Sequence, residues 1–243
     1  MTSPQHKGAV MLRATANRFS IECMLVGAVA VIVVMVFVSL RPTPISILEI
    51  AIVSAGLVAI WLGFLKSQEP YFSMSLDTHC LTYQHKFGAW QLPRTNLHSA
   101  GVPKVTFDYT ELELNAVGIK INNIDEFLIA LSPRLAAKLL IEQRHILLQA
   151  VKMYCKNGNC PEDWLIEDSE FKSPSGKQYH GLIAMFGNRM AHLRLATEFD
   201  LMLPANVLDR DIWQFANLLN HWKRDPERIM EQLHAQQTLP RSN

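Results

Sequence analysis

The sequence has few cysteines, almost no net charge and none of the short motifs that mark common catalytic sites. Only four of its 243 residues are cysteines, and only Cys155 and Cys160 lie close together. So few thiols exclude a secreted scaffold framed by disulfides. A net charge of +1 lacks the basic surplus of nucleic-acid-binding domains, so we expect no nucleic-acid partner.

Local signatures of enzymes are also missing. The chain contains no Walker A loop, no G-x-G-x-x-G, no H-E-x-x-H and no G-x-S-x-G nucleophile elbow. Cys155 and Cys160 would need two further ligands to hold zinc, and no second pair follows at a matching spacing. We therefore predict no catalytic, cofactor-binding or metal-binding residues. Whether these two cysteines have a role stays open.

Two long apolar runs dominate what is present. They cover residues 19–40 and 45–65 and are separated by Arg41-Pro42-Thr43-Pro44. At about 1.5 Å per residue, each run reaches roughly 30 Å as a helix, the thickness of the hydrocarbon core of a bilayer. The first run is longer than the apolar core of a signal peptide, and the second follows at once. The pattern predicts a transmembrane helical hairpin over residues 19–65.

Basic residues predict the orientation of this hairpin. Residues 1–18, expected to be a basic tail, contain Lys7, Arg13 and Arg18 and no acid. Basic flanks stay in the cytoplasm, so both termini are expected on the cytoplasmic side of an inner membrane crossed twice. The three basic side chains can also attract anionic lipid headgroups. Trp61, near the cytoplasmic end of the second span, is expected to be an interfacial anchor.

Each run contains one acid, Glu22 near the cytoplasmic end of the first and Glu49 near the outer turn of the second. An ionisable residue deep in a span is usually functional. These two lie at opposite ends, so a proton relay between them is not expected. A channel or transporter subunit is therefore the least supported hypothesis.

Residues 66–158 are expected to form a strand-rich unit closed by a helix over residues 132–156. Alternation places Leu81 and Tyr83 on one face of a strand, and Lys86-Phe87-Gly88 is typical of a turn into a returning strand. More short strands are expected, the last at residues 127–130. Ser132 is a typical N-cap, with Pro133 at the first helical position.

Residues 159–225 are expected to form a second strand-and-helix unit. Two strands, residues 179–186 and 190–197, are expected to be joined by a turn at Gly187-Asn188, with a third strand near 200–203 and an amphipathic helix ending near Trp222. Residues 226–243 are expected to form a short helix and a frayed tail. The predicted fold class is α+β, an antiparallel-sheet domain with packed amphipathic helices. Whether the domain forms one sheet or two strand-and-helix units remains open.

The stretch after the hairpin resembles known bacterial membrane proteins. The residues that carry the likeness are Leu81-Thr82-Tyr83, Phe87-Gly88-Ala89-Trp90 and the run from Leu92 to Leu97, which follow two spans with a very short turn. This arrangement is similar to bacterial membrane proteins with a pleckstrin-homology-like domain, and to an uncharacterised two-span family of gammaproteobacterial inner-membrane proteins with a domain of unknown function. The resemblance implies that the helix from Ser132 closes a pleckstrin-homology-like sheet. It carries over no functional residue, because the basic phosphoinositide-binding loop has no counterpart here.

Together these features predict a non-enzymatic module that is anchored in the membrane. Its expected partners are the lipid bilayer and either a membrane protein or an anionic lipid at the cytoplasmic face. The alternative is a membrane-tethered enzyme whose site is assembled from distant residues such as His180, His192 and Asp200. The oligomeric state stays open.

Overall fold

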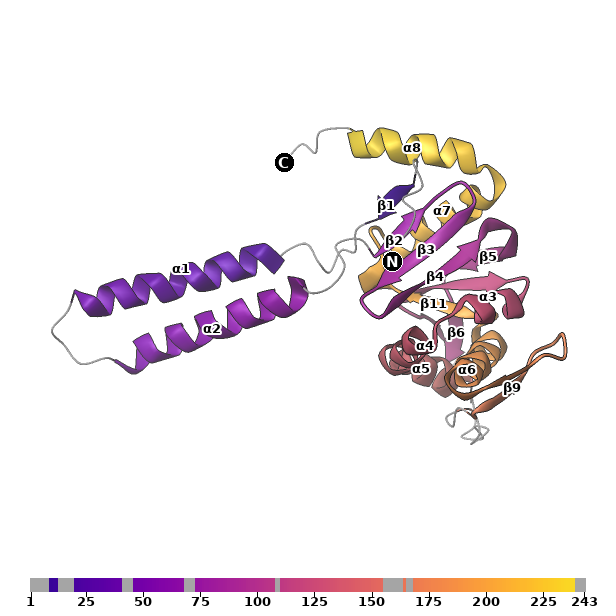
Figure 1. The fold of residues 1–243 in the computed structure, drawn as a ribbon, viewed down its shortest axis with the longest axis horizontal. Helices are drawn as coiled ribbons and strands as arrows, with labels where there is room; N and C mark the ends of the chain where they lie inside the picture. The colour runs from indigo at the N-terminus through magenta and orange to yellow at the C-terminus, as the bar shows by residue number, and fades with distance from the viewer. Residues whose placement is uncertain are drawn as a thin grey trace. The chain divides into compact units, whose positions relative to one another are not determined.

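The structure is a computed structural model that describes residues 9–12, 20–40, 46–67, 73–107, 110–154, 164 and 168–238. The chain divides into two compact units. One, Ala14–Tyr71, is called the helical hairpin below. The other joins Met1–Arg13 to Phe72–Asn243 and is called the domain (Figure 1).

The helical hairpin contains α1 (Ser20–Ser39) and α2 (Ile47–Ser67), which pack against each other. Within them, Ile21–Ser39 and Ile47–Leu65 are each long and apolar enough to cross a membrane. The two helices expected from the apolar runs are therefore present, and their ends differ from the prediction by only a few residues.

The domain is built on antiparallel sheets. Their spatial orders are β1-β2-β3-β4, β11-β8-β5, β6-β7 and β10-β9. The strands are β1 (Val10–Leu12), β2 (Met74–Leu76), β3 (Cys80–His85), β4 (Gly88–Pro93), β5 (Leu97–Gly101), β6 (Lys104–Phe107), β7 (Thr110–Glu113), β8 (Ala116–Ile121), β9 (Glu170–Lys172), β10 (Gln178–His180) and β11 (Leu201–Pro204).

Helices cover these sheets, with α4, α5 and α6 grouped together and α8 at the other end of the domain (Figure 1). The helices of the domain are α3 (Ile124–Ala130), α4 (Pro133–Glu142), α5 (Arg144–Tyr154), α6 (Gly181–Thr197), α7 (Ile212–Arg224) and α8 (Pro226–Thr238). This is the mixed helix and antiparallel-sheet architecture expected from the sequence.

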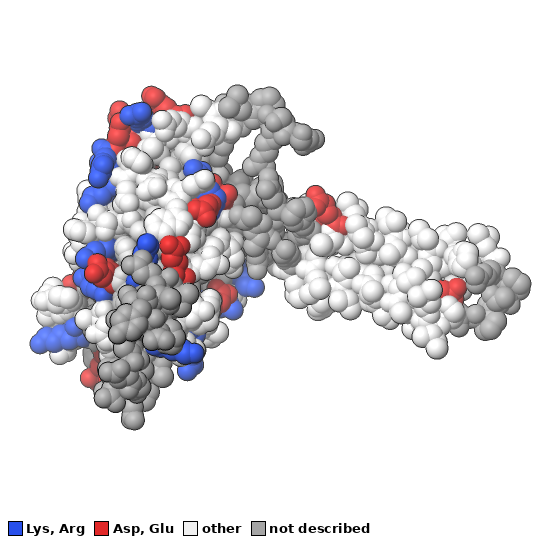
Figure 2. Space-filling model, turned by 180° about the vertical axis from the view of Figure 1, so that it is seen from behind, with Lys and Arg blue, Asp and Glu red and all other residues white. Residues whose placement is uncertain are grey.

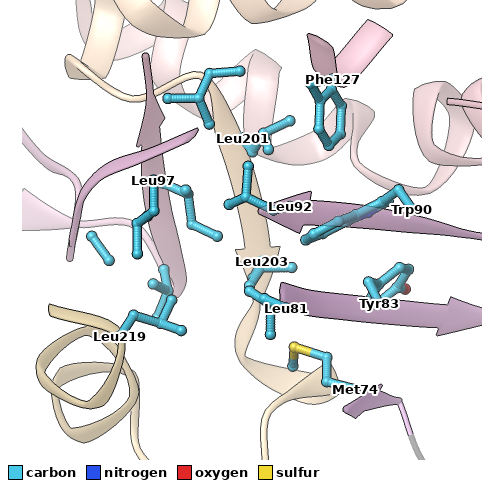
Figure 3. Close-up of a cluster of buried hydrophobic side chains, with 14 of the residues drawn as sticks. Met74, Leu81, Tyr83, Trp90, Leu92, Leu97, Phe127, Leu201, Leu203 and Leu219 are labelled. Carbon is cyan, nitrogen blue, oxygen red and sulfur yellow. The ribbon is translucent and has the colours of Figure 1, made fainter. Parts of the chain in front are cut away.

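One apolar core joins the two larger sheets (Figure 3). Leu81 and Leu92 enter it from β3 and β4, and Leu203 enters from β11; none of the three is more than 2% exposed. Trp222 is fully buried, and its indole N–H donates to the carbonyl oxygen of Asp77 at 2.8 Å. Burying each such leucine stabilises the fold by about 1.5–3 kcal/mol, so this core is what holds the sheets together.

The sheet of β5, β8 and β11 crosses the boundary expected near residue 158. β11 comes from the segment predicted to be a second unit, yet it pairs with β8 from the first, with Leu201 opposite Ile119 and Pro204 opposite Ala116. Both strands belong to the domain, one compact unit.

The strand expected at residues 127–130 is wrong, because this segment lies in α3. The Asn123 side chain accepts hydrogen bonds from the backbone N–H groups of Asp125 and Glu126, at 3.0 and 3.3 Å. An asparagine cap followed by acids in the first turn starts a helix, through hydrogen bonding and the helix dipole. Asn123 therefore begins a helix at this point of the chain, not a strand.

The two strands expected at residues 179–186 and 190–197 are also wrong. Only Gln178–His180 is a strand, and Gly181–Thr197 is the continuous helix α6. The helix is buried around much of its circumference, so its apolar residues do not follow one stripe. Gly187 does not form a turn: a Cβ there would lie 2.5 Å from the Phe171 ring, so glycine permits close packing of β9 on the helix.

The single helix expected over residues 132–156 is interrupted at Gln143, between α4 and α5. Ser132 caps α4 as predicted, accepting from the Leu135 N–H at 3.3 Å. At the other end, the buried Arg189 donates to the carbonyl oxygens of Leu139 and Leu140, at 3.3 and 2.7 Å. A guanidinium from α6 thus satisfies the Leu140 carbonyl, which a continuous helix would have used itself, while the Leu139 carbonyl also accepts from the Gln143 backbone N–H at 2.9 Å.

Candidate functional site

The helical hairpin keeps glycine on the inside and large apolar side chains on the outside. Gly27 and Gly56 face each other so closely that a Cβ on Gly27 would lie 2.7 Å from the Gly56 carbonyl oxygen. By contrast, Leu25, Leu57 and Trp61 are 56–63% exposed. Small residues let transmembrane helices approach, while large apolar side chains face lipid. A helix pair in water would have the opposite arrangement.

The acids of the hairpin lie toward its ends, and the surface between them carries no charge (Figure 2). Glu49 has a structural role. Its carboxylate accepts from the Ser46 N–H at 2.7 Å, and the Ser46 hydroxyl accepts from the Glu49 N–H at 3.3 Å. This is a capping box, so Glu49 starts α2. The Ser-Ile-Leu-Glu spacing in the sequence would have identified it.

Of the residues predicted to contact lipid, only Trp61 can be placed. It is 63% exposed on α2, with its ring centroid 6.4 Å from that of Phe64. Lys7, Arg13 and Arg18 lie outside the described residues, as do Cys155 and Cys160. Among the residues that the structure describes, no group of three or more His, Cys, Asp or Glu side chains is arranged to hold a metal ion.

The residues before and after the helical hairpin pair in one sheet. β1 lies in the segment expected to be only a basic tail, yet it pairs antiparallel with β2, with Leu12 directly opposite Met74. Val10 and Leu12 are buried, 1% and 3% exposed, and belong to the main core. The hairpin is therefore an insertion between two neighbouring strands. We call the end of the sheet at Leu12 and Met74 the tether end, because the chain leads to α1 and α2 from there.

The β3–β4 turn presents an aromatic ring close to two cations. Phe87 is 38% exposed, and the ammonium groups of Lys86 and Lys138 lie 5.3 and 5.6 Å from the centre of its ring. Lys138 belongs to α4, so the turn and the helix form one surface. Cation–π contacts at exposed sites contribute about 0.5–1 kcal/mol each.

Glu142 holds this surface together from the α4 side. Its two carboxylate oxygens lie 3.4 Å from Nε2 of His85 and 3.2 Å from Nζ of Lys138. Gly88 begins β4 with φ of 144°, a backbone conformation that favours glycine, and a Cβ there would approach Ser132 to 3.1 Å. The turn is therefore seated on the start of α4. The sequence predicted the turn but not its partner, since Lys86 and Lys138 are far apart in the chain.

A polar cluster joins α3 to the β9–β10 hairpin. The Asp125 carboxylate accepts from the hydroxyls of Ser175 and Tyr179, at 2.5 and 2.7 Å, and the Ser175 oxygen lies 2.9 Å from that of Ser173. The Ser175 hydrogen bond is the main reason that the pKa of Asp125 is lowered, while burial and then Asp125 raise the pKa of Tyr179 to about 12. Both pKa shifts favour the hydrogen-bonded pair of an ionised Asp125 and a neutral Tyr179, so the cluster fastens the β9–β10 hairpin to α3.

The residues proposed for an enzyme occupy separate environments. His180 occupies the N-cap position of α6 without a side-chain capping hydrogen bond, and His192 lies about 18 Å further along the helix, by its rise per residue. The His192 ring stacks on Trp164, with centroids 5.3 Å apart. Asp200 is 1% exposed; it accepts from the Ile121 N–H at 2.9 Å and pairs with Arg194 at 2.6 Å. Burial raises the pKa of Asp200, opposed by these two partners, and its contacts fix the end of β8 to α6.

Similarity to known proteins adds one finding. No curated protein and no solved structure shows a significant match to the chain. The sequence profile of the family described as "Protein of unknown function (DUF2982)" matches residues 74–225, which is more than half of the chain and most of the domain. The chain therefore belongs to the DUF2982 family, whose function is unknown.

Proposed function

We propose that the protein is a non-enzymatic module anchored in the bacterial inner membrane by two spans, with its domain on the cytoplasmic face. There the domain binds a lipid or protein partner. The observation that carries this proposal is the pairing of β1 with β2 on either side of the helical hairpin. Two strands in one sheet must lie on the same side of a membrane, so a membrane-inserted α1 and α2 must cross it an even number of times.

The exposed surface of the hairpin supports insertion. Its large apolar side chains face outward, and each unsatisfied backbone group in lipid would cost several kcal/mol, which two complete helices avoid. The basic residues before α1 favour a cytoplasmic location for that flank. Because β1, which precedes α1, pairs with β2, the domain is expected on the same side of the membrane as this basic flank.

Reporter fusions test the topology. Alkaline phosphatase inserted at Pro42 is expected to be active, because this turn would lie outside the cytoplasm. A green fluorescent protein fused after the last residue is expected to fluoresce, because it would stay inside. Alkaline phosphatase that is active when fused at the C-terminus would contradict the orientation. Alkaline phosphatase that is inactive both at Pro42 and at the C-terminus would contradict membrane insertion.

We also propose that the domain is pleckstrin-homology-like. Its support is the order of a four-stranded antiparallel sheet followed by a three-stranded one, over one shared core. Nuclear Overhauser contacts between the side chains of Leu92 and Leu203 are expected in solution, and their absence would contradict two sheets closed over one core.

A further inference from the structure

The register of the first sheet places the β3–β4 turn at the tether end. Tyr83 lies opposite Met74, and the Gln84 N–H donates to the Ser73 carbonyl oxygen at 2.8 Å. β3 then continues to His85, which pairs with Gly88 across the turn. At about 3.3 Å per residue, the turn extends roughly 10 Å past Met74, toward the side from which the chain arrives.

The chain that leads to the spans is short. Seven peptide steps separate Ser67, the last residue of α2, from Met74. A fully extended chain of this length spans at most about 24 Å. The tether end, and with it the β3–β4 turn, therefore cannot move far from a membrane that holds α2.

The side chains of the β3–β4 turn and the adjacent α4 suit contact with an anionic bilayer surface. Lys86 and Lys138 lie over Phe87, and Arg134, exposed one helical turn before Lys138, adds a third cation beside the carboxylate of Glu142. An exposed aromatic ring beside lysines is the composition that settles at a membrane–water interface. The other end of the same strands, the β2–β3 turn, carries Asp77 and an exposed His79 instead.

We propose that the β3–β4 turn, through Phe87, Lys86 and Lys138, lies against the anionic lipid surface of the membrane that anchors the protein. This inference rests on the proposed function, because it requires the hairpin to be inserted. The contact orients the domain: the turn faces the lipid, and the β2–β3 turn faces away. Each lysine near an anionic surface contributes an attraction that changes the ratio of docked to undocked domain about five-fold.

Photo-crosslinking in vesicles tests the proposal with the full chain. p-Benzoylphenylalanine replaces Phe87 in one variant, His79 in a second as the distal control, and Leu57 in a third to report on the span. The vesicles contain phosphatidylcholine alone or phosphatidylcholine with phosphatidylglycerol. Lipid adducts are measured by mass spectrometry of the labelled peptide.

The expected result is a lipid adduct at position 87 that exceeds that at 79 and increases with phosphatidylglycerol. In the anionic vesicles, adding Lys86→Gln is expected to lower the docked-to-undocked ratio at position 87 about five-fold. Lys172→Gln, on the exposed strand β9, is the matched control and is expected to leave it unchanged.

The lipid contact would be overturned by equal amounts of lipid adduct at positions 87 and 79, or by an amount at position 87 that does not respond to phosphatidylglycerol. It would also be overturned if position 87 crosslinked only to protein and not to lipid. Lipid adducts at position 57 distinguish a failure of the lipid contact at the β3–β4 turn from a failure of the proposed function. If position 57 reacts with lipid and position 87 does not, the anchor stands and the docking surface fails. If position 57 does not react, the membrane anchor itself fails.

Discussion

The pairing of β1 with β2 predicts that residues before the helical hairpin are needed to fold the domain after it. The test is a water-soluble variant in which a short Gly-Ser linker replaces residues 14–71. Such a linker is geometrically suitable because Leu12 and Met74 are direct partners in adjacent antiparallel strands. In this protein the contribution of β1 can be measured without a membrane.

The magnitude follows from burial. Leu12 is 3% exposed, and truncating a buried leucine to alanine costs about 2–5 kcal/mol. Val10 is 1% exposed, and removing the equivalent of two methylene groups costs about 1.6 kcal/mol before any cavity term. Val10→Ala with Leu12→Ala is therefore expected to lower the free energy of unfolding by about 4–6 kcal/mol. This is a large share of the roughly 5–15 kcal/mol of a typical domain.

Urea denaturation followed by tryptophan fluorescence measures this loss. Met11→Ala is the matched control: Met11 lies between the two on the opposite, half-buried face of β1, so its loss is expected to stay below about 1 kcal/mol. A fragment of residues 72–243 is expected to be less stable than the linked variant. If that fragment unfolds at the same urea concentration, β1 does not contribute to the core and the reasoning is refuted.

Three further predictions concern other contacts. Gly27→Leu is expected to force α1 and α2 apart, at a cost of about 1–3 kcal/mol from overpacking against Gly56; pulsed electron resonance between spin labels on the two helices measures the separation. Tyr179, with a folded pKa of about 12 against an ordinary value of 10.0, is expected to contribute stability below pH 10 that is lost as the pH rises toward 12, and Asp125→Asn is expected to lower its pKa in an ultraviolet titration. Arg189→Met is expected to cost about 2–3 kcal/mol in urea denaturation, because two carbonyls at the end of α4 lose a charged donor.

Each of these has a control and an outcome that contradicts it. Val29→Leu, at a position 57% exposed, is expected to leave the helix separation unchanged, and an unchanged separation in Gly27→Leu would contradict the close approach. An Asp125→Asn protein whose Tyr179 titrates as before would show that burial alone raises the pKa. Arg144→Met, on the exposed side of α5, is expected to be nearly neutral, and equal losses for both arginine variants would contradict the capping role of Arg189.

Features that depend on neighbouring residues were predictable from the sequence. The two long apolar helices of the hairpin follow from the length and composition of continuous apolar runs. The alternation of Leu81 and Tyr83 indicated β3, and Ser132 with Pro133 indicated the start of α4, because a side chain capping its own helix acts over three residues. The β3–β4 turn belongs to this group, since Gly88 provides its backbone conformation locally.

Features that depend on distant residues were decided by the tertiary structure. α6 shows no single apolar stripe because other elements surround it, so its periodicity could not be distinguished from short strands. β1 is three residues long and becomes a strand only because β2, on the far side of the hairpin, supplies its hydrogen-bond partners. Likewise, the proposed lipid-facing surface exists because α4 brings Lys138 to Phe87. The sequence by itself determined which segments form long apolar helices and where the first strands turn, because those depend on local composition. The packing of remote segments decided which strands pair, which helix is buried and which side chains share a surface.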